Sequence, residues 1–197
     1  MNGLPHAPRH PLLVRVTHWL AALSVGALVV SGIAILLAHP RFYWGEVGVV
    51  GMPSLFELPL PFVLNGQTGW GRSLHFLAAW ALVITGVVYV ASGARRRHFR
   101  WMLYPPLQRG AYRLVVFLLL PLMIWTGLAM SPAVTTSVPI IDRALGGQQS
   151  ARTLHFVTAL AVVAFAVGHV VMVAVAGFVP TVAGMITGGR HGQREHV

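Results

Sequence analysis

The most constraining feature of this sequence is a set of four long stretches that contain no Asp, Glu, Lys or Arg. They are residues 16–40, 73–94, 114–141 and 153–189. Each is at least as long as the roughly 20 residues that a helix needs to cross a bilayer. The chain is 56% hydrophobic and 9% charged, whereas about a quarter of the residues of a soluble domain are charged. We therefore predict an all-α membrane protein, a bundle of four transmembrane helices.

The charge-free stretches also set the expected boundaries. Residues 1–179 are predicted to form a single transmembrane domain, and residues 180–197 a polar C-terminal tail. The helices are placed at about 12–38, 72–93, 112–131 and 151–179. The first helix begins like a signal peptide, but its apolar part is too long and no cleavage site follows, so it is interpreted as a retained span.

A fifth apolar stretch, residues 47–64, is interrupted by three prolines. Proline removes a helical hydrogen bond and disfavours a spanning helix. We therefore expect residues 39–71 to form an outer loop on the membrane surface. The same loop is rich in aromatic residues, which are typical both of an interfacial belt and of a partner contact.

The arginines predict the orientation of the four helices. With the N-terminus inside, ten arginines lie in cytoplasmic segments and four in outer ones, which agrees with the positive-inside rule. This pattern predicts a multi-pass membrane protein with both termini in the cytoplasm. The run "RRRHFR" at 95–100 is interpreted as a topology anchor that contacts anionic lipid, and no nucleic-acid partner is expected despite the net charge of +10.

Four of the ten histidines lie inside the predicted spans or at their mouths: His18, His75, His155 and His169. Polar side chains at such depth are costly and usually functional. His18 begins the first helix and lies near the inner face, whereas His75 and His155 begin the second and fourth helices near the outer face. His169 lies fourteen residues after His155, which is about 21 Å further inward and nearly four turns along one helix face.

The histidines therefore form two pairs at different depths, His75 with His155 outside and His18 with His169 inside. Two imidazoles on facing helices suit a six-coordinate haem, which needs one axial ligand on each face. We predict two b haems stacked across the bilayer, with these four histidines as the iron ligands.

An arginine precedes three of these histidines by three residues, in "RVTHWL", "RSLHFL" and "RTLHFV". One helical turn separates the two positions, so Arg15, Arg72 and Arg152 lie on the same side of the helix as their histidines. Each is predicted to bind a haem propionate through a charge-assisted hydrogen bond. The alternative is an interfacial anchor whose head group reaches the membrane surface.

Other chemistries fit the sequence less well. The chain has no cysteine, which excludes thiol catalysis and iron–sulfur clusters, and no catalytic residue is evident in the core. A zinc or copper site would need three or four converging ligands. Interhelical hydrogen bonding and a histidine-dependent membrane transporter remain as alternatives.

The same residues carry a resemblance to a known family. The segments "RVTHWL", "GRSLHFLAAW" and "RTLHFVTALAVVAFAVGHV", over about residues 12–179, resemble the bacterial cytochrome b561 family, which includes the cytochrome b subunits of nickel–iron hydrogenases. The resemblance implies electron transfer between a membrane quinone, ubiquinone or menaquinone, and a periplasmic redox partner. The loop "RFYWGEVGVVGMPSLFELPLP" (41–61) further resembles members that act beside molybdopterin oxidoreductases. An alternative within the family is a stand-alone superoxide:ubiquinone oxidoreductase.

Overall fold

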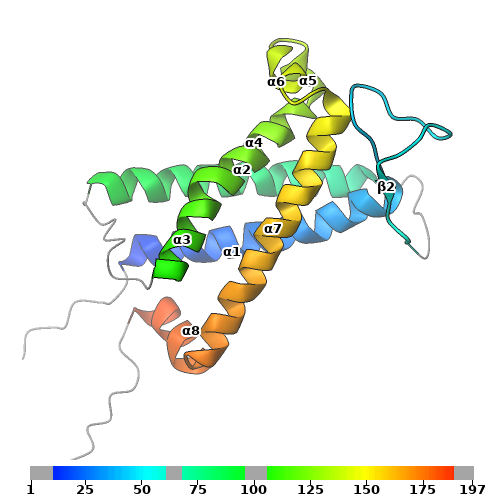
Figure 1. Ribbon diagram of the computed structural model, residues 1–197. Coiled ribbons are helices and arrows are strands. Elements are labelled where there is room, and N and C mark those ends of the chain that lie inside the picture. Colours follow the sequence, from blue (N-terminus) through cyan, green and yellow to red (C-terminus); the bar gives the residue numbers. More distant parts are fainter. Residues whose placement is uncertain (1–10, 61–67, 96–105, 189–197) are drawn as a thin grey trace, which may run out of the picture. The chain divides into compact units, whose positions relative to one another are not determined.

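Helices dominate the fold (Figure 1). The computed structural model describes residues 11–60, 68–95 and 106–188. Four helices in these ranges are long and apolar enough to cross a membrane: Leu12–Ala38, Gly69–Gly93, Gln108–Ala129 and Gln148–Val175. The prediction of an all-α chain with four spanning helices is therefore confirmed. The arginines predicted to anchor the topology at 96–100 lie outside the described residues.

Short elements connect the long helices. In chain order the elements are α1 Leu12–Ala38, β1 Arg41–Phe42, β2 Phe56–Glu57, α2 Thr68–Arg95, α3 Pro106–Leu114, η2 Val115–Leu119, α4 Leu120–Ala129, α5 Pro132–Thr135, α6 Ile140–Arg143, α7 Gln148–Val175 and α8 Phe178–Thr187. Helix α1 ends two residues before Pro40, since the residue preceding a proline is disfavoured in helical conformation. The strands β1 and β2 pair antiparallel inside the outer loop.

The third spanning helix contains a π-helical segment, η2, between α3 and α4. The backbone N–H of Leu120, the residue after η2, donates to the carbonyl of Val115, five residues earlier. Pro121 follows at once and has no N–H to continue the ordinary ladder. The single widened turn beside the proline accommodates the missing bond.

The end of the chain differs from the predicted polar tail. Helix α7 stops at Val175, and a separate apolar helix, α8, covers residues that were divided between the fourth span and the tail. Gly177 separates the two helices with a φ of 98°, and Gly188 ends α8 with a φ of 78°. Both values favour glycine, which has no Cβ to clash. The described part of the charge-free stretch therefore contains the rest of α7 and all of α8, separated at Gly177.

The described chain divides into two compact units, each built from segments that are distant in sequence. One contains α1 up to Gly32, α2 from Gly69, and the chain from Gly168 onward, including α8. The other contains the end of α1, the outer loop, α3 to α6, and α7 up to Val167. In the first unit α1 and α2 run side by side in opposite directions (Figure 1). In the second, α4 approaches α7 near the turn formed by α5 and α6.

Small residues make up most of the buried positions in the spans, whereas large apolar side chains are exposed. The buried set is Thr17, Ser24, Ser31, Ala34, Ala78, Thr85, Val115, Thr126, Ala129, Ala151, Thr153 and Thr158, with Ser150 at the start of α7. Leu23 and Val175, by contrast, are 71% and 85% exposed. Small residues permit close helix packing, and exposed large ones suit contact with lipid.

Candidate cofactor-binding site

His18 and His169 lie together in the first unit, as the depth argument predicted. Their ring centroids are 6.3 Å apart and the rings are tilted by 55°. A metal–imidazole bond is about 2.0–2.1 Å long, and a ring centre lies about 1.2 Å behind its nitrogen, so two rings facing one metal have centroids about 6.4 Å apart. The observed separation fits a metal atom held between the two imidazoles.

His75 lies on α2 against the end of α1. Its Nδ1 is 3.0 Å from the hydroxyl oxygen of Ser31. Gly32 is adjacent, and a methyl group placed there would be 3.7 Å from the Cε1 atom of His75. The imidazole of His75 therefore contacts the hydroxyl group of Ser31 and lies beside Gly32, which has no side chain.

His155 has the same surroundings in the second unit. Its Nδ1 is 2.8 Å from the hydroxyl oxygen of Thr126 on α4. A methyl group on Gly127 would be 3.6 Å from the Cε1 atom of His155. Gly32 and Gly127 therefore occupy matching positions beside the two histidines. His75 and His155 belong to different units.

Two of the three predicted arginines make main-chain contacts. Arg15 donates from Nη1 to the carbonyl of Ile186 in α8 at 2.7 Å, while its Nε is buried without a hydrogen-bond acceptor. Arg152 donates to the carbonyl of His39 and lies 5.0 Å from the ring centre of Phe42. Arg72 is exposed on α2. The buried Nε of Arg15 is a donor that an anionic group such as a propionate would satisfy.

The outer loop packs on the first turns of α7, next to His155. Phe42 is only 1% exposed and lies 4.7 Å from Phe56 and 4.5 Å from Phe156, centroid to centroid. Thr153 donates to the carbonyl of Tyr43 at 2.7 Å, inside the contact. The loop therefore covers the helix turn that carries His155.

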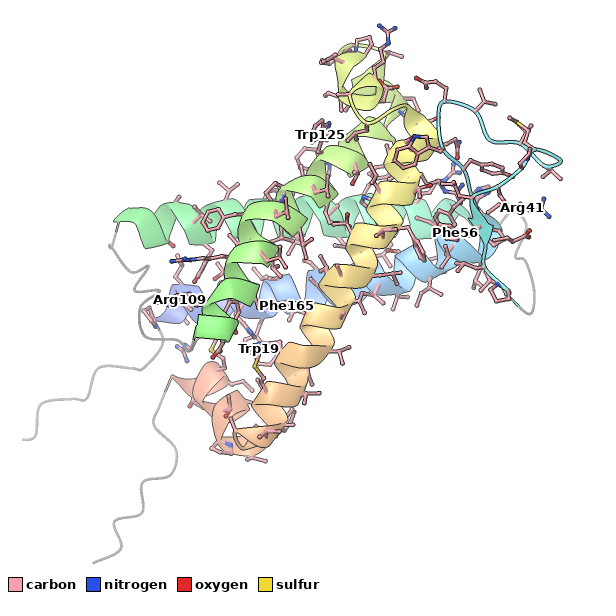
Figure 2. All side chains as sticks on the ribbon, in the orientation of Figure 1. Trp19, Arg41, Phe56, Arg109, Trp125 and Phe165 are labelled. Atoms are coloured by element: carbon pink, nitrogen blue, oxygen red, sulfur yellow. The ribbon has the colours of Figure 1, made fainter. Side chains whose placement is uncertain are left out.

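An exposed ion pair closes the strand ladder of the same loop. The Nε atom of Arg41 and the carboxylate of Glu57 are 3.0 Å apart, and Arg41 and Phe56 mark the two strands in Figure 2. The Glu57 carboxylate raises the pKa of Arg41 through their hydrogen bond and the attraction of opposite charges. The pair joins the strands at the solvent side, away from the buried Phe42.

Helix α8 packs on the start of α1, next to His18. Trp19 donates from its indole nitrogen to the carbonyl of Met185 at 3.3 Å, and Arg15 binds the next carbonyl (Figure 2). The last four carbonyls of a helix have no N–H donor within that helix, so donors from elsewhere bond to them. The ring of Trp19 also meets that of His18 edge to face at 5.3 Å.

Several of these residues escaped the sequence analysis. Ser31 and Thr126 were not singled out, although a small hydroxyl followed by glycine recurs in "SG" and "TG". The main-chain contacts of Arg15 and Arg152 left no sequence signal, since side-chain reach depends on the fold. Among the residues that the structure describes, no three or more His, Cys, Asp or Glu side chains gather at one point.

Two comparisons with known proteins bear on this site. The family model described as prokaryotic cytochrome b561 matches residues 9–188. A protein from Azospira oryzae, named putative protein-methionine-sulfoxide reductase subunit YedZ1, is 31% identical over an alignment that covers 84% of this chain and 89% of the relative. The family match includes all four histidines of the spans and helix α8.

Proposed function

Because the chain belongs to the prokaryotic cytochrome b561 family, we propose that it is a di-haem cytochrome that transfers electrons between a membrane quinone and a periplasmic redox partner. The family assignment and the four spanning helices establish the coarser statement, that this is a multi-pass membrane protein with a haem b electron-transfer role. The haem group, when bound, supplies the reversible one-electron chemistry. The protein supplies ligands, orientation and surroundings.

The observation that carries the proposal is the 6.3 Å separation of His18 and His169. These residues are 151 positions apart in the sequence, and their ring centroids are separated by about the distance expected for two imidazoles on one iron. We propose that these two residues would hold the iron of the inner haem. His75 and His155, each oriented by a hydroxyl group, are proposed as the ligands of the outer haem.

The arginines are proposed to hold the propionates. The buried Nε of Arg15 supports this role at the inner haem. Arg72 and Arg152 are proposed for the outer haem, because each lies one turn before an outer histidine. Arg152 would then both hold the outer loop and neutralise a propionate.

The partner is proposed to be a periplasmic reductase of the molybdopterin oxidoreductase class. One relative is named as a subunit of a protein-methionine-sulfoxide reductase, which supports a role as the membrane subunit of a reductase. The proposed orientation, with both termini in the cytoplasm of a bacterial inner membrane, directs the outer loop toward that partner. We further propose that residues 1–179 work as one cytochrome domain, with α8 closing its inner end, and that ubiquinone or menaquinone exchanges electrons near His18 and His169.

Absorbance spectroscopy tests this function. Protein purified from haem-replete cells is expected to show sharp low-spin b-type bands on reduction with dithionite, and also with a quinol. Addition of the periplasmic reductase and its oxidised substrate should then reoxidise the protein. His191→Ala, in the predicted tail, is the matched control for histidine loss. A colourless protein would refute the function, and quinone reduction by superoxide without any partner would favour the stand-alone oxidoreductase.

A further inference from the structure

The two helix pairs that carry His75 and His155 repeat the same sequence elements. The first helices contain "VSGIA" (30–34) and "WTGLA" (125–129), and the second contain "RSLHF" (72–76) and "RTLHF" (152–156). In both pairs the hydroxyl of the first helix reaches the Nδ1 atom of the histidine on the second. The repeated sequence therefore corresponds to a repeated contact.

Both hydroxyl groups are fully buried. Ser31 and Thr126 each have 0% exposure, in helices that otherwise present large apolar side chains. Each is 2.7 Å from the carbonyl four residues earlier, that of Ala27 for Ser31 and that of Leu122 for Thr126. Each also lies within 3.0 Å of an imidazole nitrogen.

These distances determine which group donates. A hydroxyl carries one proton. If that proton pointed to the imidazole, the hydroxyl oxygen and the helix carbonyl would be two unprotonated acceptors 2.7 Å apart, which is unfavourable. If the hydroxyl donates to the carbonyl and the imidazole Nδ1–H donates to the hydroxyl, both hydrogens have an acceptor and no two lone pairs face each other. In that arrangement the Nε2 atom keeps its lone pair and is the coordinating nitrogen.

Other hydroxyls in the spans supply a comparison within the same chain. Thr17 and Thr158 are also buried, and each donates to the carbonyl four residues earlier, at 2.8 and 2.7 Å. This carbonyl bond is therefore the usual arrangement for a buried hydroxyl here. What distinguishes Ser31 and Thr126 is the additional imidazole placed at their free lone pair.

We propose that Ser31 and Thr126 are positioning residues for the outer haem, each accepting the Nδ1–H of one histidine and thereby fixing Nε2 as the ligand atom. This inference rests on the proposed function. A hydrogen bond at Nδ1 fixes the ring orientation and makes the imidazole a more basic ligand. A more basic ligand favours the oxidised iron, so both hydroxyls lower the reduction potential of the outer haem.

Isosteric substitution tests the proposal. Thr126→Val removes the hydroxyl that accepts from His155 and keeps the side-chain volume. Ser31→Ala removes the hydroxyl that accepts from His75. Thr126→Ser keeps a hydroxyl and should retain the contact with His155. In a redox titration with low-temperature EPR of the oxidised protein, Thr126→Val and Ser31→Ala should each raise the potential and change the EPR signal of the same haem. Loss of such a second group typically lowers metal-site affinity by about 10–100-fold, so retention of that haem should also fall, while the other haem is unchanged.

The matched control is Thr158→Val, which removes a buried hydroxyl three residues after His155 but leaves the Thr126 contact intact. The proposal is overturned if wild-type protein holds two haems and Thr126→Val leaves potentials and EPR signals unaltered. It is also overturned if Thr158→Val has the same effect as Thr126→Val, or if Thr126→Ser does not restore the wild-type values. Wild-type protein without haem would instead refute the proposed function itself, so the two failures are distinguishable.

Discussion

The outer loop and helix α8 each cover a helix segment that carries a candidate ligand, but they are held in different ways. The outer loop is fixed on α7 by a buried aromatic cluster around Phe42 and by the hydrogen bond from Thr153 to Tyr43. Helix α8 is held on α1 by hydrogen bonds from the side chains of Arg15 and Trp19, while its Phe178 and Val179 are 54% and 74% exposed. We infer that the outer loop is held more firmly on α7 than α8 is held on α1.

The largest effect is expected from Phe42→Ala, which should weaken the attachment of the outer loop to α7. Truncation of a buried phenylalanine costs about 3–5 kcal/mol, and here most of that cost should appear as undocking of the loop from α7. Hydrogen–deuterium exchange of the loop and of the first turn of α7 should accelerate by more than tenfold. Val50→Ala, at a residue that is 84% exposed, is the control; equal effects of the two variants would contradict a loop held by Phe42.

A smaller effect is expected at the inner end from Arg15→Ala. Hydrogen bonds to charged groups contribute about 1.5–3 kcal/mol, and partial exposure of this contact reduces that value. Exchange of α8 amides should increase by up to about tenfold while the outer loop is unchanged. The neighbouring residue Val16 points outward, and Val16→Ala should leave α8 unaffected. Unaltered exchange in Arg15→Ala would show that other contacts hold the helix.

The smallest effect is expected from Glu57→Gln. The Arg41–Glu57 pair is exposed on both sides, and exposed ion pairs contribute little because water screens them. Loss of the carboxylate should return the pKa of Arg41 toward its ordinary value, which has no consequence for its charge near neutral pH. Loop exchange should match that of wild type. A loop that undocks in this variant would mean that charge, and not the aromatic cluster, holds it.

Much of this architecture was predictable because it depends on where charged residues are absent and on how far each histidine lies along its span. Charge-free stretches gave the four spans, and counting residues from each span's start gave the level of His18 and His169, which the structure brings together. Ser31 and Thr126 were missed because a buried hydroxyl in an apolar helix looks the same in sequence as an ordinary packing residue. Helix α8 was missed because Gly177 is one of 21 glycines, and only its positive φ marks it as a break.

The main-chain contacts of Arg15 and Arg152 could not be read from the sequence for another reason. Each reaches a carbonyl more than 100 residues away, and such contacts depend on tertiary packing that no local pattern encodes. The spacing of three residues between arginine and histidine indicates on which side of the helix each arginine lies. It contains no information about the carbonyl that accepts the hydrogen bond.

Haem counting after removal of single histidines tests the central claim most directly. The account predicts two haems per chain in wild type, one in His169→Ala, one in His155→Ala, and none in the double variant, with the two single variants retaining haems of different spectra and potentials. Single variants that both lose the same haem, or a His169→Ala protein that keeps two, would contradict two bis-histidine sites at different depths.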